Sequence, residues 1–138
     1  LADQAITWEA VYNATAITYP ACYRTEMTGA TIKDILEDVA DNLFNPDPYY
    51  QQGGDMVRAG GLGFSLHVDK PIGRRIQDLR STRTGQPIEA QRRYVVTGWA
   101  SVNDGTEGPP IWDVVARHLA HHKVVEVPRN EAVRLVRG

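Results

Sequence analysis

A strongly amphipathic segment that ends abruptly at two prolines constrains the fold of this chain more than any other feature. Between Thr28 and Asn45 the apolar residues recur at spacings of three and four, as they do along one face of a helix. Thr28 is a residue type that favours the N-cap, and neither Pro46 nor Pro48 can continue a helix. The pattern predicts a helix whose apolar stripe packs on the rest of the domain: Ile32, Ile35, Leu36, Val39, Leu43 and Phe44.

The other face of this predicted helix is acidic. We expect Lys33 and Glu37 to pair across one turn, and Asp34, Asp38 and Asp41 to face solvent. The spacing also brings carboxylates together, as for Glu37 and Asp41. We interpret these pairs as a solvated surface rather than as acid–base catalysts.

Short alternating segments elsewhere predict β-strands, and the clearest, in residues 62–68, is typical of a half-buried strand. Further strands are expected over residues 21–27, 76–79 and 94–100, and helices over 6–12, with Thr7 as N-cap, and 111–121. Residues 124–127 are expected to form a short final strand or an extended segment. We interpret the tail, 130–138, as short helix or coil. Because helices and strands mix without strict alternation, we predict a single α+β domain over residues 1–138, with a mixed, mostly antiparallel sheet.

Bulk properties narrow the possible partners. The chain has 138 residues, enough for one domain with a core, and a net charge of −2, which favours neither nucleic acid nor an anionic membrane.

Cys22 is the only cysteine, so no internal disulfide can form, and we interpret it as a buried thiol. No apolar run is long enough to span a bilayer. Since the sequence opens on Leu1, we expect a piece of a longer protein.

Two glycine-rich loops, residues 49–61 and 101–110, carry the residues that best suit binding. In the first loop, Arg58 offers a planar, bidentate fork for sulfate-like or phosphate-like oxyanions. Near the second, Trp99 follows Gly98 at a strand end and could form an aromatic wall. The alternatives are a surface connection for the first loop, a surface ion pair for Arg58 and core packing for Trp99.

No self-contained catalytic set accompanies these loops. His118, His121 and His122 share a helix at spacings that can hold a metal, but no acidic residue completes a zinc-protease pattern. We interpret them as a solvated helix end. Serine-nucleophile and phosphate-loop signatures are absent from the sequence.

Three segments together resemble the C-terminal domain of the 5′-nucleotidase family. They are residues 28–37 (TGATIKDILE), 54–64 (GDMVRAGGLGF) and 92–96 (RRYVV), in the family's order along the chain. Longer runs are similar to one branch of that family, the SoxB thiosulfohydrolases of bacterial sulfur oxidation. These runs are residues 37–39, 41–58, 73–78, 98–100 and 112–117.

The resemblance implies a two-domain parent. An N-terminal metallophosphoesterase domain, absent here, would hold two manganese ions, and this domain would need no cofactor and be inactive alone. The parent would release sulfate from a cysteine S-sulfonate on the carrier protein SoxYZ, in the periplasm. The family's metal ligands belong to the missing domain and are not transferred to His118, His121 or His122.

In the nucleotidases this domain recognises the substrate, with aromatic residues from two loops stacking on the base. Met56 falls where the first loop has its stacking phenylalanine, and Arg58 falls at the family's glutamine position. In the second loop, residues 103–108 (NDGTEG) replace the family's GGDGF. The resemblance therefore implies a substrate without a base, bound by Gln52, Asp55, Met56, Arg58, Trp99 and Asn103. Two alternatives stay open: a nucleotide-recognition domain, and a module that only docks the carrier.

Overall fold

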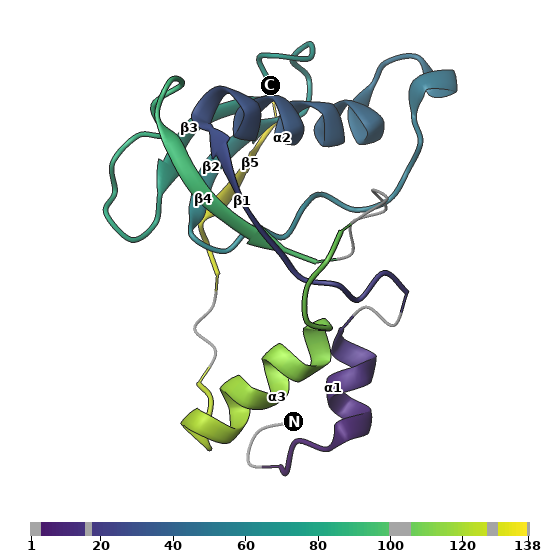
Figure 1. The fold of residues 1–138 in the computed structure, drawn as a ribbon. Coiled ribbons are helices and arrows are strands. Elements are labelled where there is room, and N and C mark those ends of the chain that lie inside the picture. Colours follow the sequence, from purple (N-terminus) through teal and green to yellow (C-terminus); the bar gives the residue numbers. More distant parts are fainter. Residues whose placement is uncertain (1–3, 16–17, 100–105, 127–129, 138) are drawn as a thin grey trace. The chain divides into compact units, whose positions relative to one another are not determined.

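The computed structural model describes residues 4–15, 18–99, 106–126 and 130–137. They divide into two compact units, each described by itself: a first unit of residues 1–26 with 95–128, and a second unit of residues 27–94 with 129–138. Figure 1 shows the elements in chain order. They are α1 (Trp8–Ala14), β1 (Tyr23–Thr28), α2 (Gly29–Phe44), the short 3₁₀ helix η1 (Pro48–Tyr50), β2 (Leu62–His67), β3 (Ile76–Ser81), β4 (Arg93–Gly98), α3 (Ile111–His122) and β5 (Val133–Val136). Among the described residues, no helix is long and apolar enough to cross a membrane.

Helix α2 dominates the second unit, and its ends are those that the sequence predicts. The Thr28 side chain caps it by accepting a hydrogen bond from the Thr31 N–H at 3.2 Å. Its buried apolar residues, Ile32, Leu36 and Ala40, follow one another at intervals of four. The expected stripe is wrong at Ile35, which is 42% exposed, because Ile35 lies to one side of that row.

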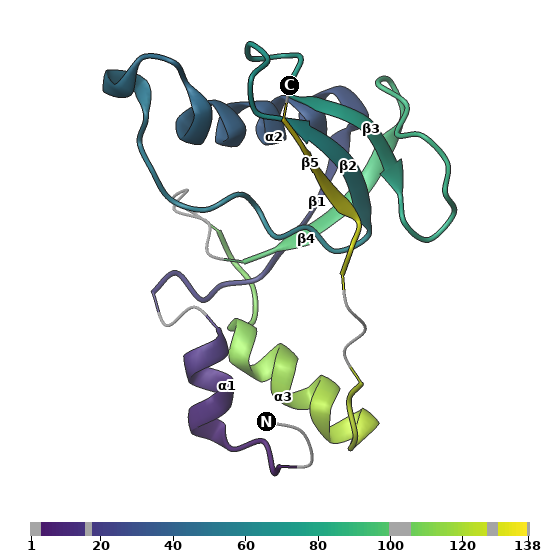
Figure 2. The same ribbon diagram turned by 180° about the vertical axis from the view of Figure 1, so that it is seen from behind.

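A three-stranded sheet in the order β3-β2-β5 faces α2. Strand β2 pairs antiparallel with β3, with Leu66 opposite Ile76 and an irregularity between Gly63 and Ser65. In Figure 2 the three strands lie in front of α2, which crosses one face of the sheet. Phe64, Ser65 and Leu66 are all buried, so the prediction of a half-buried β2 is wrong. Neighbouring residues of a strand face opposite sides of its sheet, so both faces of β2 are buried here. Its alternating sequence suggests instead that one face would be exposed to solvent.

The C-terminal tail supplies the third strand of this sheet, which corrects the prediction of helix or coil there. β5 pairs parallel with β2, with Phe64 opposite Val133 and Leu66 opposite Leu135. Of the two forms expected over residues 124–127, the strand is not found in the described part, residues 124–126. A four-residue strand gains its stability from a partner distant in sequence, so local pattern alone favours neither assignment.

The first unit packs α1 against α3. Thr7 caps α1 as predicted, by accepting a hydrogen bond from the Ala10 N–H at 3.2 Å. The rings of Tyr12 and Trp112, one from each helix, lie 5.3 Å apart between centroids. Before α3, the Cys22 N–H donates to the Pro109 carbonyl at 2.9 Å.

Strand β4 pairs with β1 in a separate two-stranded sheet. Its residues alternate between exposed and half-buried, and Val95 is 52% exposed, so β4 is not the core strand that its apolar sequence predicts. The expected fold class, α+β with a mixed sheet, is confirmed by these elements.

Candidate functional site

The loop between α2 and β2, residues 45–61, is the first candidate site, and we call it the glycine loop. Its first half is held by hydrogen bonds rather than by packing. The Asp47 carboxylate accepts from the Tyr49 N–H at 3.0 Å, which starts η1. The Gln51 side-chain amide donates to the Asn45 carbonyl at 2.7 Å, and the Gly53 N–H donates to the Asn42 carbonyl at 3.3 Å. These contacts tie the loop back onto the end of α2.

The backbone conformation at the next two positions favours glycine. Gly53 and Gly54 have φ angles of 77° and 92°, a region that residues with a Cβ atom rarely occupy. Residues 55–58 follow directly after these two glycines. The glycines that mark this loop in the sequence therefore have a direct conformational role.

The loop presents the predicted binding residues to solvent. Gln52, Asp55 and Arg58 are exposed, and Met56 is half-buried. Arg58 forms no ion pair or hydrogen bond with any residue that the structure describes, so the surface ion pair considered as its alternative role is not present among them. A guanidinium in this state has all its donors free for an anion.

The two tyrosines of the glycine loop do not pack on the edge of the core, as they would if the loop were a plain surface connection. Tyr49 is 95% and Tyr50 66% exposed, and both belong to η1. Exposed tyrosines on a hydrogen-bonded turn are typical of protein-binding surfaces, because a rigid aromatic side chain loses little entropy on binding.

The remaining predicted residues belong to the other unit or fall outside the described residues. Trp99 follows β4 in the first unit and is 48% exposed, so it is not a core residue. A Cβ atom on the neighbouring Gly98 would lie 2.5 Å from the Tyr23 hydroxyl oxygen, so this glycine admits the Tyr23 ring. Asn103 lies outside the described residues. The grouping of Arg58 with Trp99 and Asn103 therefore stays a prediction.

The acidic face of α2 is not the solvated surface that the sequence predicts. Glu37 is 3% exposed, and its carboxylate accepts hydrogen bonds from the backbone N–H groups of Gly73, Arg75 and Ile76 at 2.8, 3.2 and 2.8 Å. The pairing of Lys33 with Glu37 is confirmed, at 3.5 Å. The expectation fails because three backbone donors of the 73–76 segment, distant in sequence, satisfy this carboxylate.

Asp41 also departs from the prediction, since it pairs with the guanidinium of the buried Arg75. A hydrogen bond from Arg75, and a second from Asn45, hold the pKa of the Asp41 carboxyl below its ordinary value of 3.8. Only Asp34 and Asp38, of the three aspartates expected in solvent, are exposed. Sequence reasoning also missed Arg75, whose position beside Ile76 at the start of a strand was the available signal.

The histidines of α3 form a ring cluster rather than a ligand set. The His118 and His122 rings lie 4.3 Å apart, and those of His121 and His122 lie 4.9 Å apart and nearly perpendicular. Across the described residues, no group of three or more histidine, cysteine or acidic side chains is arranged to hold a metal ion. The part of the chain that the structure describes therefore does not fit a dinuclear metal centre.

Cys22 does not have the environment of a nucleophile. Burial raises the pKa of its thiol above the ordinary value of 9.0, which opposes formation of the reactive thiolate. The thiol is half-buried and free.

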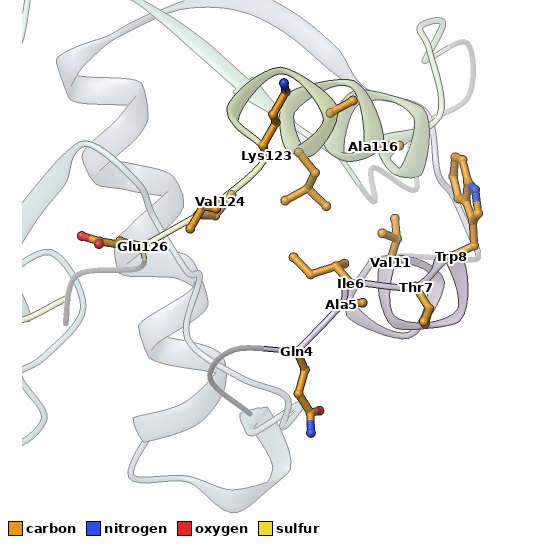
Figure 3. A pocket seen from close by; sticks show the side chains of 13 residues that line it. Gln4, Ala5, Ile6, Thr7, Trp8, Val11, Ala116, Lys123, Val124 and Glu126 are labelled. Carbon is orange, nitrogen blue, oxygen red and sulfur yellow. The ribbon is translucent and has the colours of Figure 1, made fainter.

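The first unit contains a cavity of about 1020 Å³ between α1 and α3. In Figure 3 the polar ends of Lys123 and Glu126 point away from the apolar side chains around Ile6 and Val11. Such a lining suits apolar groups and offers little to an oxyanion. The residues that line it are Gln4, Ala5, Ile6, Thr7, Trp8, Val11, Ala116, Leu119, Ala120, Lys123, Val124, Val125 and Glu126.

The sequence matches a family model over residues 1–117, that of the 5′-nucleotidase C-terminal domain. The chain belongs to this family, which confirms the resemblance of its sequence segments. In such proteins the C-terminal domain accompanies an N-terminal metallophosphoesterase domain. No curated protein matches the chain by sequence.

Among solved structures, the chain is similar to the sulfate thiohydrolase SoxB of Thermus thermophilus, in complex with glycerol. The identity is 37% and the TM-score 0.84, over 96% of this chain and 26% of that one. The NAD nucleotidase of Haemophilus influenzae shares 17% identity, with a TM-score of 0.72 over 96% of this chain and 26% of that one. A 5′-nucleotidase precursor from Thermus thermophilus shares 15%, with a TM-score of 0.68 over 95% and 28%. The last two show a common fold, and the chain spans about a quarter of the length of each of the three.

Proposed function

We propose that this chain is the substrate-recognition domain of a SoxB-like thiosulfohydrolase of the periplasm. Its parent would act on a cysteine S-sulfonate carried by SoxYZ during thiosulfate oxidation. The support is the similarity to SoxB, at 37% identity over nearly the whole chain, against 15% and 17% for the two nucleotidases. The sequence runs that resemble SoxB include the glycine loop itself.

The observation that carries this proposal is that Arg58 is exposed and pairs with none of the residues that the structure describes. A sulfonate presents three oxygens with a shared negative charge, and a guanidinium can hold two of them through parallel hydrogen bonds. Met56, where the nucleotidases place a stacking phenylalanine, offers no aromatic face to a base. This combination suits a small anionic group better than a nucleotide.

The reaction of the parent is a hydrolysis that balances without an oxidant or reductant. A water oxygen attacks the sulfonate sulfur, the bond between that sulfur and the cysteine sulfur breaks, and sulfate departs. The attacking water loses two protons as sulfate forms; in the overall balance the carrier thiolate takes up one and the other goes to solvent. In this scheme Arg58 binds the sulfonate oxygens, orients the group, and screens its negative charge from the approaching nucleophile.

The two manganese ions implied for such a parent are not expected to bind to this chain. The described residues do not fit a dinuclear centre, so no step of the hydrolysis is derived through one. We assign those ions to the N-terminal metallophosphoesterase domain and expect this domain to be inactive alone.

A carrier-docking module is the second candidate, and the exposure of Tyr49 and Tyr50 favours it. Under this alternative, the tyrosines bind the SoxYZ polypeptide, and Arg58 does not touch the reacting group. A nucleotide-recognition domain is the third candidate, with the shared fold as its support.

Sulfate release by the parent-length protein and by this domain alone, with manganese, tests the proposal. The substrates are S-sulfonated SoxYZ and free S-sulfocysteine. We expect activity in the parent only, and an Arg58→Ala loss on both substrates. A loss confined to SoxYZ supports docking alone, and activity of the isolated domain contradicts the proposal.

A further inference from the structure

Arg75 is the largest side chain in the second unit that is almost completely buried, with 1% of its surface exposed. Its guanidinium pairs with the Asp41 carboxylate and donates a second hydrogen bond to the Phe44 carbonyl at 3.1 Å. Both acceptors lie in the last turn of α2, directly before the glycine loop. The third donor site, Nε, is buried and has no hydrogen-bond partner among the described residues.

Hydrogen bonds continue from this ion pair into the glycine loop. The second oxygen of Asp41 accepts from the Asn45 side-chain amide at 2.8 Å. The side-chain oxygen of Asn45 then accepts from the Asp47 N–H at 3.0 Å, and its carbonyl accepts from the Gln51 side chain at 2.7 Å. Asn45 is thus fixed by α2 on one side and holds both ends of the η1 turn on the other.

Burying the charged Arg75 side chain costs free energy, and the need to fill space in the core does not explain why an arginine is there. An apolar side chain of similar volume would avoid the desolvation of a permanent charge and the unpaired Nε. What the guanidinium adds is direction: its planar fork reaches two acceptors at the end of α2 at once. A buried ion pair of this kind specifies one conformation of the groups that it holds.

We propose that Arg75, acting through Asp41 and Asn45, is a positioning residue that holds the glycine loop in its binding conformation. It touches neither substrate nor reacting atoms. By keeping the η1 turn and the Gly53–Asn42 hydrogen bond in one arrangement, it places Arg58 before the substrate arrives. This inference rests on the proposed function for the role of Arg58, whereas the ordering of the loop is independent of the substrate.

Hydrogen exchange of the backbone amides tests the ordering directly. In Arg75→Met and in Asp41→Asn, the amides of Tyr49, Tyr50 and Gly53 should exchange about tenfold faster or more, while amides shared between β2 and β3 keep their protection. Ile76→Val is the matched control, because it changes a buried neighbour and leaves the network intact. Asp41→Asn keeps the size of the side chain, so the exchange rates of its loop amides test the inference even if Arg75→Met does not fold. Loop amides that exchange at the wild-type rate in the folded variants, or a loss of protection spread equally over the loop and the β2–β3 amides, would overturn the inference.

Kinetics of the parent-length protein separate positioning from stability. If the loop is correctly placed in about a tenth of the Asp41→Asn molecules, KM should rise about tenfold with kcat nearly unchanged. Ile76→Val should change neither constant. Should the parent prove to act on a nucleotide, the proposed function fails, but a raised KM for that nucleotide together with faster loop exchange still supports the positioning role. Wild-type KM together with wild-type loop exchange contradicts it.

Discussion

The carboxylate of Glu37 on α2 accepts a hydrogen bond of 2.8 Å from the backbone N–H of Ile76, the first residue of β3. Two further backbone N–H groups, of Gly73 and Arg75, donate to the same carboxylate. One side chain therefore satisfies the donors of the whole turn that leads into β3. This contact joins the helix that starts the glycine loop to the sheet beneath it.

Replacing Glu37 by glutamine should destabilise the domain by about 2–3 kcal/mol. The neutral amide oxygen accepts weaker hydrogen bonds than a carboxylate oxygen, and the amide NH2 group would face backbone N–H groups to which it cannot bond. Asp38→Asn, on the exposed face of the same helix, is the matched control and should stay within about 0.5 kcal/mol. Urea unfolding of the three proteins measures both changes. Equal stability of Glu37→Gln and wild type would show that the three bonds contribute nothing net.

Asp41 should make stability depend on pH in the acid range. The Arg75 hydrogen bond lowers the pKa of this carboxyl in the folded state, so its contribution is complete at neutral pH, where it is ionised in both states. The contribution is lost as the pH falls below 3.8 and through the lower pKa of the folded state. Asp41→Asn should therefore show a flatter decline of unfolding free energy from about pH 6 to about pH 2.5. Parallel curves for the two proteins would refute this.

Gly29, the first residue of α2, should not tolerate a side chain. A Cβ atom there would lie 2.2 Å from the Glu89 carbonyl oxygen, and the Gly29 N–H donates to the Arg92 carbonyl at 3.0 Å. Gly29→Ala should lower stability by about 2 kcal/mol, since a backbone segment must move. Gly60→Ala is the control, because nothing lies within 4 Å of its Cβ position and its φ angle is not in the left-handed region. A thermal melt of each variant distinguishes them, and an unaffected Gly29→Ala protein would mean that the segments separate readily.

Much of the fold follows from local sequence pattern. The caps at Thr7 and Thr28 and the end of α2 before Pro46 follow from side-chain chemistry within a few residues, and these predictions hold. The α+β class follows from the order of the elements. Such features need no knowledge of what lies across the core.

The failures at Glu37, Asp41 and the C-terminal tail involve partners distant in sequence. Local pattern places Glu37 and Asp41 in solvent, because their hydrogen-bond donors come from residues more than thirty positions away. The β5 tail becomes a strand only because the edge of β2 is there to pair with it. For the candidate site, the sequence predicts the glycine loop and Arg58 as binding groups, and the structure shows Arg58 exposed. The burial of Arg75 and its contacts with the end of α2 come from the structure, since its place beside Ile76 is only a weak sequence signal.

Replacing Arg58 is the most direct test of the proposal that this domain recognises an S-sulfonate. The measurement is kcat/KM of the parent-length protein for sulfate release from S-sulfonated SoxYZ, beside phosphate release from a nucleoside monophosphate. We predict activity on the S-sulfonate alone. Arg58→Ala should then lower kcat/KM about 100-fold, as expected for two lost charge-assisted hydrogen bonds, while Arg83→Ala, at another exposed arginine, should have little effect. Hydrolysis of the nucleotide instead, or a change within about twofold for Arg58→Ala, would contradict the account.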